Sequence, residues 1–213
     1  MHCLEFLMSQ RRGPSSSIPW SPGGGGQQPL LQIHQPHDPV RHRVESYIAQ
    51  RYRQRYGANL KEWLPTLVSV QADGEIVAAA GYRPASQPLF LERYLTAPVE
   101  RYIREDGVPV RRESIVEVGH FAAMRPGAGR LLVPLLVAHL HRQGYEWAVC
   151  TLTAELHHLF ARMGLAHRSL AVASAASLDE RERQDWGDYY AHGPEVFSGH
   201  LRTILQRFGE QSA

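Results

Sequence analysis

The sequence is poor in cysteine and lysine, and it has no long hydrophobic run. Its 213 residues include two cysteines, Cys3 and Cys150, and a single lysine, Lys61. Two cysteines cannot form a framework of several disulfides, which excludes a small secreted domain held together by such bridges. The longest apolar run, residues 131–140, has about half the length that a bilayer-spanning helix needs. We therefore expect no stable membrane insertion.

Signals for export, nucleic-acid binding and metal binding are also missing. Residues 1–10 lack the basic start, the long apolar middle and the small-residue cleavage site of a signal peptide. The formal net charge of +2 is too small to indicate a nucleic-acid partner. The twelve histidines do not fall at metal-ligand spacing, and neither His-Glu-x-x-His nor Cys-x-x-Cys occurs. We expect a soluble, cytoplasmic protein with no metal and no nucleic-acid partner.

Composition divides the chain into two parts. Residues 1–36 are rich in serine, proline and glycine and cannot bury enough apolar surface to offset the entropy of ordering. We expect a disordered leader there, and the sequence leaves open whether this segment is made in the cell. Residues 37–213 are expected to form one domain, since 43% hydrophobic residues over the whole chain are enough for a core.

Helix and turn signals place the first elements of this domain. Asp38-Pro39 is typical of the start of a helix and Gly57 of its end, so we expect a helix between them. Asp73-Gly74 between two apolar runs predicts a β-hairpin. Residues 88–106 are expected to be helical in two pieces, with a break at Ala97-Pro98.

The rest of the domain alternates between strands and helices. Strands are expected at 115–123, 147–153 and 169–173, and helices at 131–140 and 154–163. This alternation predicts a single domain of the α/β (α+β) class, with a mixed, partly parallel central sheet flanked by helices. The aromatic residues at 186–190 are expected to close the core rather than to bind a ligand.

The stretch from Ile115 to Arg130 combines a buried strand, a glycine turn and the start of a helix. Glu117 and His120 are the only polar side chains of the strand, and residues 126–129 form the turn. Glycines let the backbone approach a ligand, and the free N–H groups of a first helical turn attract anions. The pattern favours a transferase site for a phosphate-bearing donor, although glycine turns before helices also occur as plain caps.

Glu117 is the first candidate catalytic residue, and His120 is the second. An amine must lose a proton before it attacks a thioester, and a desolvated carboxylate with a raised pKa can accept that proton. The alternative for Glu117 is a purely structural ion pair with Arg83 or Arg112. His120 faces the other side of a regular strand, so both residues reach one site only if a bulge at Gly119 bends the strand.

The next strand supplies weaker candidates. Thr151 and Thr153 could hydrogen-bond a substrate, against the alternative that threonine simply suits a strand. Cys150 alternates away from both and has no evident base partner, so it is a poor candidate nucleophile.

Four segments resemble the bacterial thermostable hemolysin family. They are Pro88-Leu-Phe-Leu-Glu-Arg-Tyr-Leu, Pro98-Val-Glu, Ile115-Val-Glu-Val-Gly-His-Phe-Ala and Trp186-Gly-Asp-Tyr-Tyr. They occur in the order of the family, and the resemblance covers about residues 36–200. One departure is His120, where the family usually has asparagine.

The resemblance implies a GNAT-like (N-acyltransferase) fold, related more distantly to the acyl-homoserine lactone synthases. It implies an acyl-CoA, or the phosphopantetheine of an acyl carrier protein, as donor. The donor's phosphates map onto Arg125, Gly127, Ala128, Gly129 and Arg130. Two departures from the acyltransferase pattern are Met124, in place of the usual glutamine or arginine, and Phe160, in place of a tyrosine proton donor.

Family motif position also assigns Arg83 and Glu92 to the pocket of a small-molecule acceptor. The leading hypothesis is transfer of an acyl group from a CoA or carrier-protein thioester to an amine acceptor, with Glu117 as general base. The alternatives are a membrane-lytic hemolysin and a catalytically inactive acyltransferase fold that only binds. The sequence does not identify the acyl chain, the acceptor or the oligomeric state.

Overall fold

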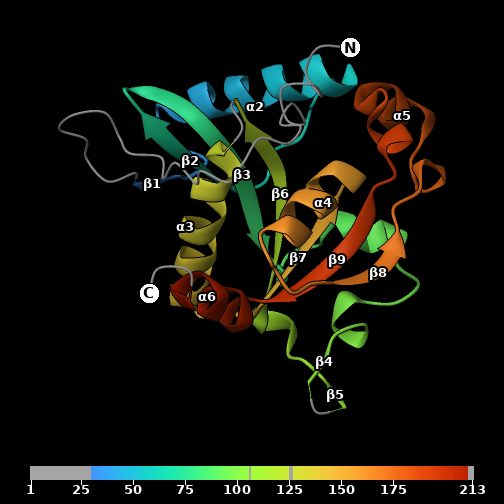
Figure 1. Ribbon diagram of the computed structural model, residues 1–213. Helices are drawn as coiled ribbons and strands as arrows, with labels where there is room; N and C mark the ends of the chain where they lie inside the picture. Colours follow the sequence, from blue (N-terminus) through green and yellow to red (C-terminus); the bar gives the residue numbers. More distant parts are fainter. Residues whose placement is uncertain (1–29, 106, 125–126, 211–213) are drawn as a thin grey trace, which may run out of the picture.

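A seven-stranded sheet forms the centre of the molecule (Figure 1). The computed structural model describes residues 30–105, 107–124 and 127–210. The sheet order is β1-β2-β3-β6-β7-β9-β8. The strands are β1 (Leu31–His34), β2 (Thr66–Ala72), β3 (Glu75–Pro84), β6 (Ile115–Ala123), β7 (Trp147–Leu152), β8 (Arg168–Val172) and β9 (Glu195–His200). β6 and β7 are parallel and all other neighbours in this sheet are antiparallel, which confirms the expected mixed sheet.

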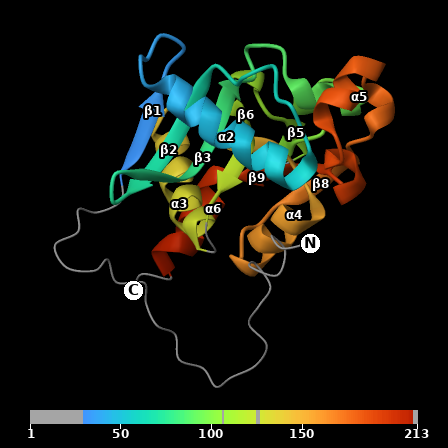
Figure 2. The same cartoon turned by 90° about the horizontal axis from the view of Figure 1, so that it is seen from above.

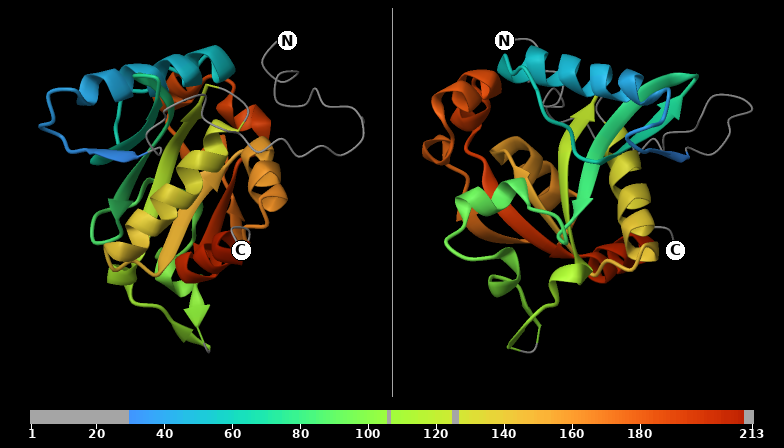
Figure 3. Two further views of the ribbon diagram at one scale, coloured as in Figure 1. Left: turned by 60° about the vertical axis from the view of Figure 1, so that its left-hand side comes forward. Right: turned by 180° about the vertical axis from the view of Figure 1, so that it is seen from behind.

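Helices cover both faces of the sheet (Figure 2). They are α2 (Arg41–Tyr56), α3 (Ala128–Arg142), α4 (Ala154–Arg162), α5 (Glu180–Trp186) and α6 (Leu201–Glu210). One core cluster joins α2 to Leu67 and Ala79, and another joins α3 and α6 to Val68 and Ala80. Because side chains alternate along a strand, these clusters lie on opposite faces. A small hairpin of β4 (Arg104–Glu105) and β5 (Val108–Pro109) extends from the end of the molecule opposite α2 (Figures 1 and 3).

The ordered fold begins earlier than we expected. Residues 31–34, assigned to the leader by composition, pair as β1 with β2. The first helix begins at Arg41 rather than at Asp38-Pro39, because the Asp38 carboxylate accepts the Val40 N–H at 3.0 Å and so closes the turn that precedes the helix. Gly57 ends the helix in a left-handed conformation, as expected.

Other elements also differ from the expectation. Residues 88–106 contain two short 3-10 turns, η1 (Phe90–Tyr94) and η2 (Val99–Arg101), in place of two helices, although Pro98 does mark the break. No strand was expected at 195–200, yet β9 lies there and separates β7 from β8. Its pairing with β7 and β8 depends on contacts far apart in the sequence.

Buried Arg41 holds the segment that leads into β2. Its guanidinium donates to the carbonyls of His34 (3.1 Å), Leu64 (2.8 Å) and Pro65 (2.7 Å), and it pairs with Glu45 at 2.7 Å. These bonds join β1, α2 and the end of the loop 57–65. The loop is thereby fixed over the sheet, where it forms one wall of the candidate site.

The parallel pair β6–β7 separates in mid-sheet. The pairing runs from Ile115–Trp147 to Val118–Cys150 and then ends, while β6 continues to Ala123. The two halves of the sheet diverge beyond this point (Figure 3). The backbone therefore opens at the position of the two candidate residues Glu117 and His120.

Candidate functional site

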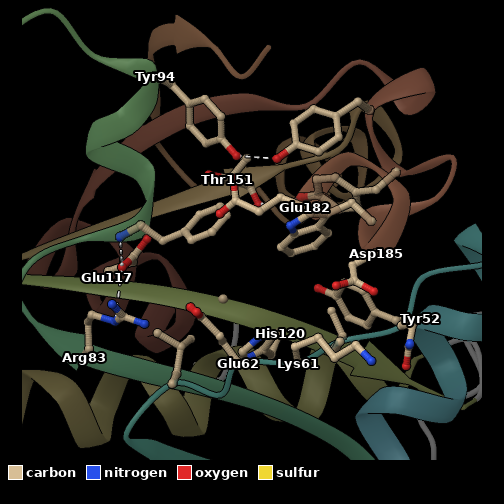
Figure 4. Close-up of a pocket in the computed structure, with 18 of the residues that line it drawn as sticks. Tyr52, Lys61, Glu62, Arg83, Tyr94, Glu117, His120, Thr151, Glu182 and Asp185 are labelled. Carbon is tan, nitrogen blue, oxygen red and sulfur yellow. Dashed lines mark hydrogen bonds and ion pairs between the residues drawn. The ribbon is translucent and has the colours of Figure 1, made fainter. Parts of the chain in front are cut away.

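A cavity of about 380 Å³ lies over the point where β6 and β7 part (Figure 4). Its floor comes from β6 and β7, and its walls from the loop 57–65, from η1 and from the segment α5–η5, where η5 is Tyr189–His192. The lining includes Tyr52, Lys61, Glu62, Leu64, Arg83, Phe90, Tyr94, Glu117, Val118, Gly119, His120, Thr151, Glu182, Asp185, Trp186, Tyr189 and Tyr190. The cavity thus combines a strand carboxylate, a histidine and many aromatic rings.

A bulge in β6 brings Glu117 and His120 to the same cavity. Relative to its partner β3, β6 carries one extra residue between Gly119 and Ala122. His120 has a φ of 55°, in the left-handed region that is rare for residues other than glycine. This bulge, next to Gly119, meets the condition stated above for both residues to reach one site. Asparagine and histidine both tolerate this conformation better than most residues. This accounts for histidine at position 120 in this chain, where the resemblance implies asparagine in the family.

Glu117 is buried, and each of its carboxylate oxygens accepts one backbone hydrogen bond. Its two carboxylate oxygens accept the backbone N–H groups of Phe90 (3.1 Å) and Leu91 (3.0 Å). The Arg83 Nε atom lies 3.5 Å from Oε2. Burial raises the pKa of Glu117 above its ordinary value, and the charge of Arg83 and the two N–H groups oppose that rise. The carboxylate therefore anchors η1 and has a raised proton affinity.

His120 is neutral at physiological pH. Burial lowers its pKa to about 4, and the charges of Arg83 and Arg41 act in the same direction. Its Nδ1 atom is buried and makes no hydrogen bond within the described part of the chain. The ring lies against Trp63 and Tyr52, with centroid separations of 5.3 and 6.2 Å. A neutral imidazole with an unmet nitrogen at a cavity wall can hydrogen-bond a bound molecule.

The structure brings together some of the other predicted substrate-binding residues. Arg83 and Thr151 line the cavity, but Glu92 and Thr153 do not. Glu92 forms an ion pair with Arg112, whose Nη2 donates to it at 2.9 Å, and accepts the Val99 N–H at 3.0 Å. Arg112 is therefore not the partner of Glu117, and Arg83 is. Thr153 is fully buried at the start of α4.

The predicted donor residues lie at the start of α3. Gly127 precedes the helix with a φ of 93°, Ala128 is its first residue, and the first turn contains no acidic side chain. A Cβ at Gly129 would lie 3.7 Å from Leu159 of α4. Residues 127–130 line neither this cavity nor the second one described below. Arg125 falls outside the described residues.

Five aromatic rings cover the cavity, a position that was not predicted from the sequence. We define the aromatic roof as Phe90, Tyr94, Trp186, Tyr189 and Tyr190. The rings pack on one another, as expected for the cluster at 186–190, but they also line the cavity. The signal was present in the density of tyrosine and tryptophan, but the sequence alone does not show that α5–η5 folds back over β6.

Contacts between η1 and α5–η5 hold the aromatic roof in place. Arg93 pairs with Glu182 at 2.7 Å, and the hydroxyl groups of Tyr94 and Tyr190 hydrogen-bond each other. At Gly187 a Cβ would lie 2.3 Å from the Tyr56 carbonyl oxygen, so only glycine allows the two backbones to come this close.

A second, apolar cavity of about 50 Å³ lies on the other face of the sheet, between the sheet, α3 and α6. It is lined by Val118, Phe121, Val133, Leu136, Val137, Leu140, Cys150, Phe160 and Ile204, among others. Val118 lines both cavities. Phe160 packs edge-on against Phe121 with a centroid separation of 5.5 Å.

Cys150 is a free cysteine of β7. Burial and the charge of Glu117 raise the pKa of Cys150 to about 12, which keeps the thiol protonated. Within residues 30–210, less the short gaps, no three His, Cys, Asp or Glu side chains are grouped to hold a metal ion. In the same part of the chain, no helix has the length and hydrophobicity to cross a bilayer.

Solved structures share this fold at low sequence identity. The acyl-homoserine lactone synthase LasI is 15% identical with a TM-score of 0.56, covering 85% of this chain and 94% of its own. BjaI, a CoA-dependent acyl-homoserine lactone synthase solved with SAM and isopentyl-CoA, is 11% identical with a TM-score of 0.57, over 86% and 89%. FeeM, an N-acyl amino acid synthase from uncultured soil microbes, is 12% identical with a TM-score of 0.56, over 84% and 98%. The fold is thus that of the acyl-homoserine lactone synthases.

No curated protein matches the sequence significantly. The family described as thermostable hemolysin matches residues 34–205, a range that contains all four segments of the resemblance and every residue that lines the two cavities. The chain therefore belongs to the thermostable hemolysin family.

Proposed function

We propose that this protein is an acyltransferase that moves an acyl group from a CoA or carrier-protein thioester to an amine. One observation carries the proposal. The side chains of Glu117 and His120 line the same cavity, at the point where β6 and β7 part. The acyltransferase folds of LasI, BjaI and FeeM support it.

Glu117 acts as general base in this proposal. The ammonium of the acceptor loses its proton to Glu117, directly or through a water, and the amine nitrogen attacks the thioester carbonyl. The C–S bond then breaks, and the second proton that the nitrogen loses on becoming an amide passes through water to the thiolate. Each oxygen of Glu117 has a lone pair beyond the one used by Phe90 or Leu91, so the base role and the anchoring role are compatible.

The donor's phosphates bind at the start of α3. The N–H groups of Ala128 and Gly129 and the absence of acidic side chains in that turn suit an anion. Arg125 and Arg130 add positive charge in the sequence. The acyl chain occupies the apolar cavity, and its carbonyl carbon lies near Val118, which both cavities share.

The acceptor occupies the larger cavity, where Arg83 and Thr151 contact it and His120 Nδ1 receives or donates a hydrogen bond. Glu92 and Thr153 line neither cavity, so we assign them a supporting role. Glu92 keeps Arg112 and Val99 in place beside η1.

Calorimetry and thermal shift against acetyl-, medium-chain and long-chain acyl-CoA, with free CoA as control, test the donor. We expect saturable binding with a preferred chain length. Glu117→Gln should lower turnover by at least about 100-fold and leave donor binding intact. The matched control is Glu113→Gln, an exposed glutamate just before β6 that lines neither cavity. Turnover of Glu117→Gln at the level of Glu113→Gln would contradict the base role.

The two alternative functions predict different results. An inactive fold would bind donor without turnover of any amine, and the engagement of both Glu117 oxygens by backbone N–H groups is the observation that favours it. A membrane-lytic protein would release dye from liposomes in the absence of an acyl donor.

A further inference from the structure

More acidic than basic side chains line the larger cavity, and the acidic side chains differ in whether they have a partner. The charged lining of the cavity comprises five acids (Glu62, Glu117, Asp179, Glu182, Asp185) and three bases (Lys61, Arg83, Arg181). Glu117 faces Arg83, Glu182 pairs with Arg93, and Asp179 caps α5. Asp185 is half-buried and makes no side-chain hydrogen bond or ion pair to any residue that the structure describes. A half-buried carboxylate without a partner at a cavity wall favours a cationic ligand.

Asp185 and Glu117 lie on opposite sides of the cavity (Figure 4). Beside Asp185 the wall consists of the rings of Tyr52 and Trp186, and rings attract cations through their negative faces. Lys61 also lines this side, but it is exposed and not ion-paired to Asp185. His120 lies between Asp185 and Glu117, and its buried Nδ1 atom has no hydrogen-bond partner among the described residues. This favours a ligand long enough to reach from Asp185 to Glu117.

We propose that the acceptor is an amine that carries a second, non-reacting positive group, which binds at Asp185 against Tyr52 and Trp186. This inference rests on the proposed function. The reacting nitrogen must be neutral when it attacks at Glu117, so it cannot supply the positive charge that the Asp185 end favours. A separate cationic group, such as the far ammonium of a diamine, meets that requirement.

A matched set of four-carbon amines tests the inference by calorimetry on the full chain. The set is 1,4-diaminobutane, 4-aminobutan-1-ol and 4-aminobutanoate, whose second groups are positive, neutral and negative. We expect the diamine to bind at least about tenfold more tightly than the amino alcohol, and the amino acid to bind most weakly. Homologues of three to six carbons allow for the unknown span of the cavity.

Two substitutions should act in opposite directions. Asp185→Asn should remove the preference for the diamine, whereas Lys61→Gln should preserve or strengthen it. Glu180→Gln on the same helix is the matched control, since Glu180 is exposed and lines no part of the cavity. Tightest binding of 4-aminobutanoate, lost in Lys61→Gln, would overturn the inference and indicate an anion subsite.

Failure of this inference can be told apart from failure of the proposed function. Acyl-CoA binding without any selectivity for the diamine series would overturn the second cation and leave acyl transfer standing. Diamine selectivity that depends on Asp185, without binding of any acyl-CoA, would support the cation subsite and count against the CoA donor.

Discussion

At Glu117, burial and hydrogen bonding act in opposite directions on one carboxyl group. Burial raises its pKa, while Arg83 and the N–H groups of Leu91 and Phe90 favour the charged form. A carboxyl whose pKa is raised in the folded state is destabilising as an anion, because the favourable protonated state is lost as pH rises through the folded pKa. Such a cost is consistent with the general-base role proposed for Glu117.

His120 gives the clearest prediction at the scale of a residue. The unfolded imidazole takes up a proton near pH 6.5, but the folded one only near pH 4. Between these values the unfolded state binds more protons, so stability present above pH 6.5 is lost as pH falls toward 4. This loss reaches at most about 3 kcal/mol.

His120→Asn should therefore flatten the pH dependence of unfolding without distorting the bulge, because asparagine tolerates a positive φ. Urea denaturation at pH 7 and at pH 4.5 measures the effect. His158→Asn, at an exposed histidine of α4, is the control. An equal loss of stability on acidification in the wild type and in His120→Asn would contradict the prediction.

At the scale of elements, a pair of facing glycines positions the wall of the cavity. Gly81 of β3 and Gly119 of β6 are paired across the sheet, and the side chain of Leu64 packs over both. A Cβ at Gly81 would lie 2.9 Å from Leu64 Cβ and 2.9 Å from Leu67 Cδ2. The absence of side chains at this pair thus lets the loop 57–65 lie close to the sheet.

Gly81→Ala should destabilise the protein by about 1–3 kcal/mol through overpacking and weaken amine binding, because Leu64 must move. Gly209→Ala in α6 is a control of opposite sign, since nothing lies within 4 Å of a Cβ there and alanine favours a helix. Thermal unfolding and calorimetry measure the two effects. Unchanged stability in Gly81→Ala would show that the loop is not held against the sheet as described.

The elements that were predicted correctly have signals within a few residues. Asp73-Gly74 adopts positive φ at both positions and forms its hairpin, and Gly57 ends α2. For the strand at 115–123 the alternation of side chains indicated only a condition, a bulge at Gly119, under which His120 would reach the same site as Glu117. β9 could not be foreseen, because its position depends on pairing with strands 147–152 and 168–172. The aromatic residues at 186–190 pack against the core as expected, but their position at the cavity was not predicted, because it depends on the docking of α5–η5 onto α2.

At the scale of the whole molecule, the sheet separates two cavities of different chemistry. The larger one is polar and aromatic and lies on the α2 side, and the smaller one is apolar and lies on the α3–α6 side. Val118, where the parallel pairing of β6 and β7 ends, lines both cavities. Under the proposed function, the donor and the acceptor would approach Val118 from opposite faces and would not compete for space.

This arrangement predicts that the apolar cavity sets the acyl-chain preference. Leu136→Ala should enlarge that cavity and shift the tightest-binding acyl-CoA to a longer chain, at a cost of about 2–5 kcal/mol in stability. Leu132→Ala is the matched control, since Leu132 is an equally buried leucine of α3 that does not line the cavity. Calorimetry with an acyl-CoA series measures both variants. A shift of equal size in both would mean that general loosening of α3, rather than the shape of the cavity, determines which chain is bound.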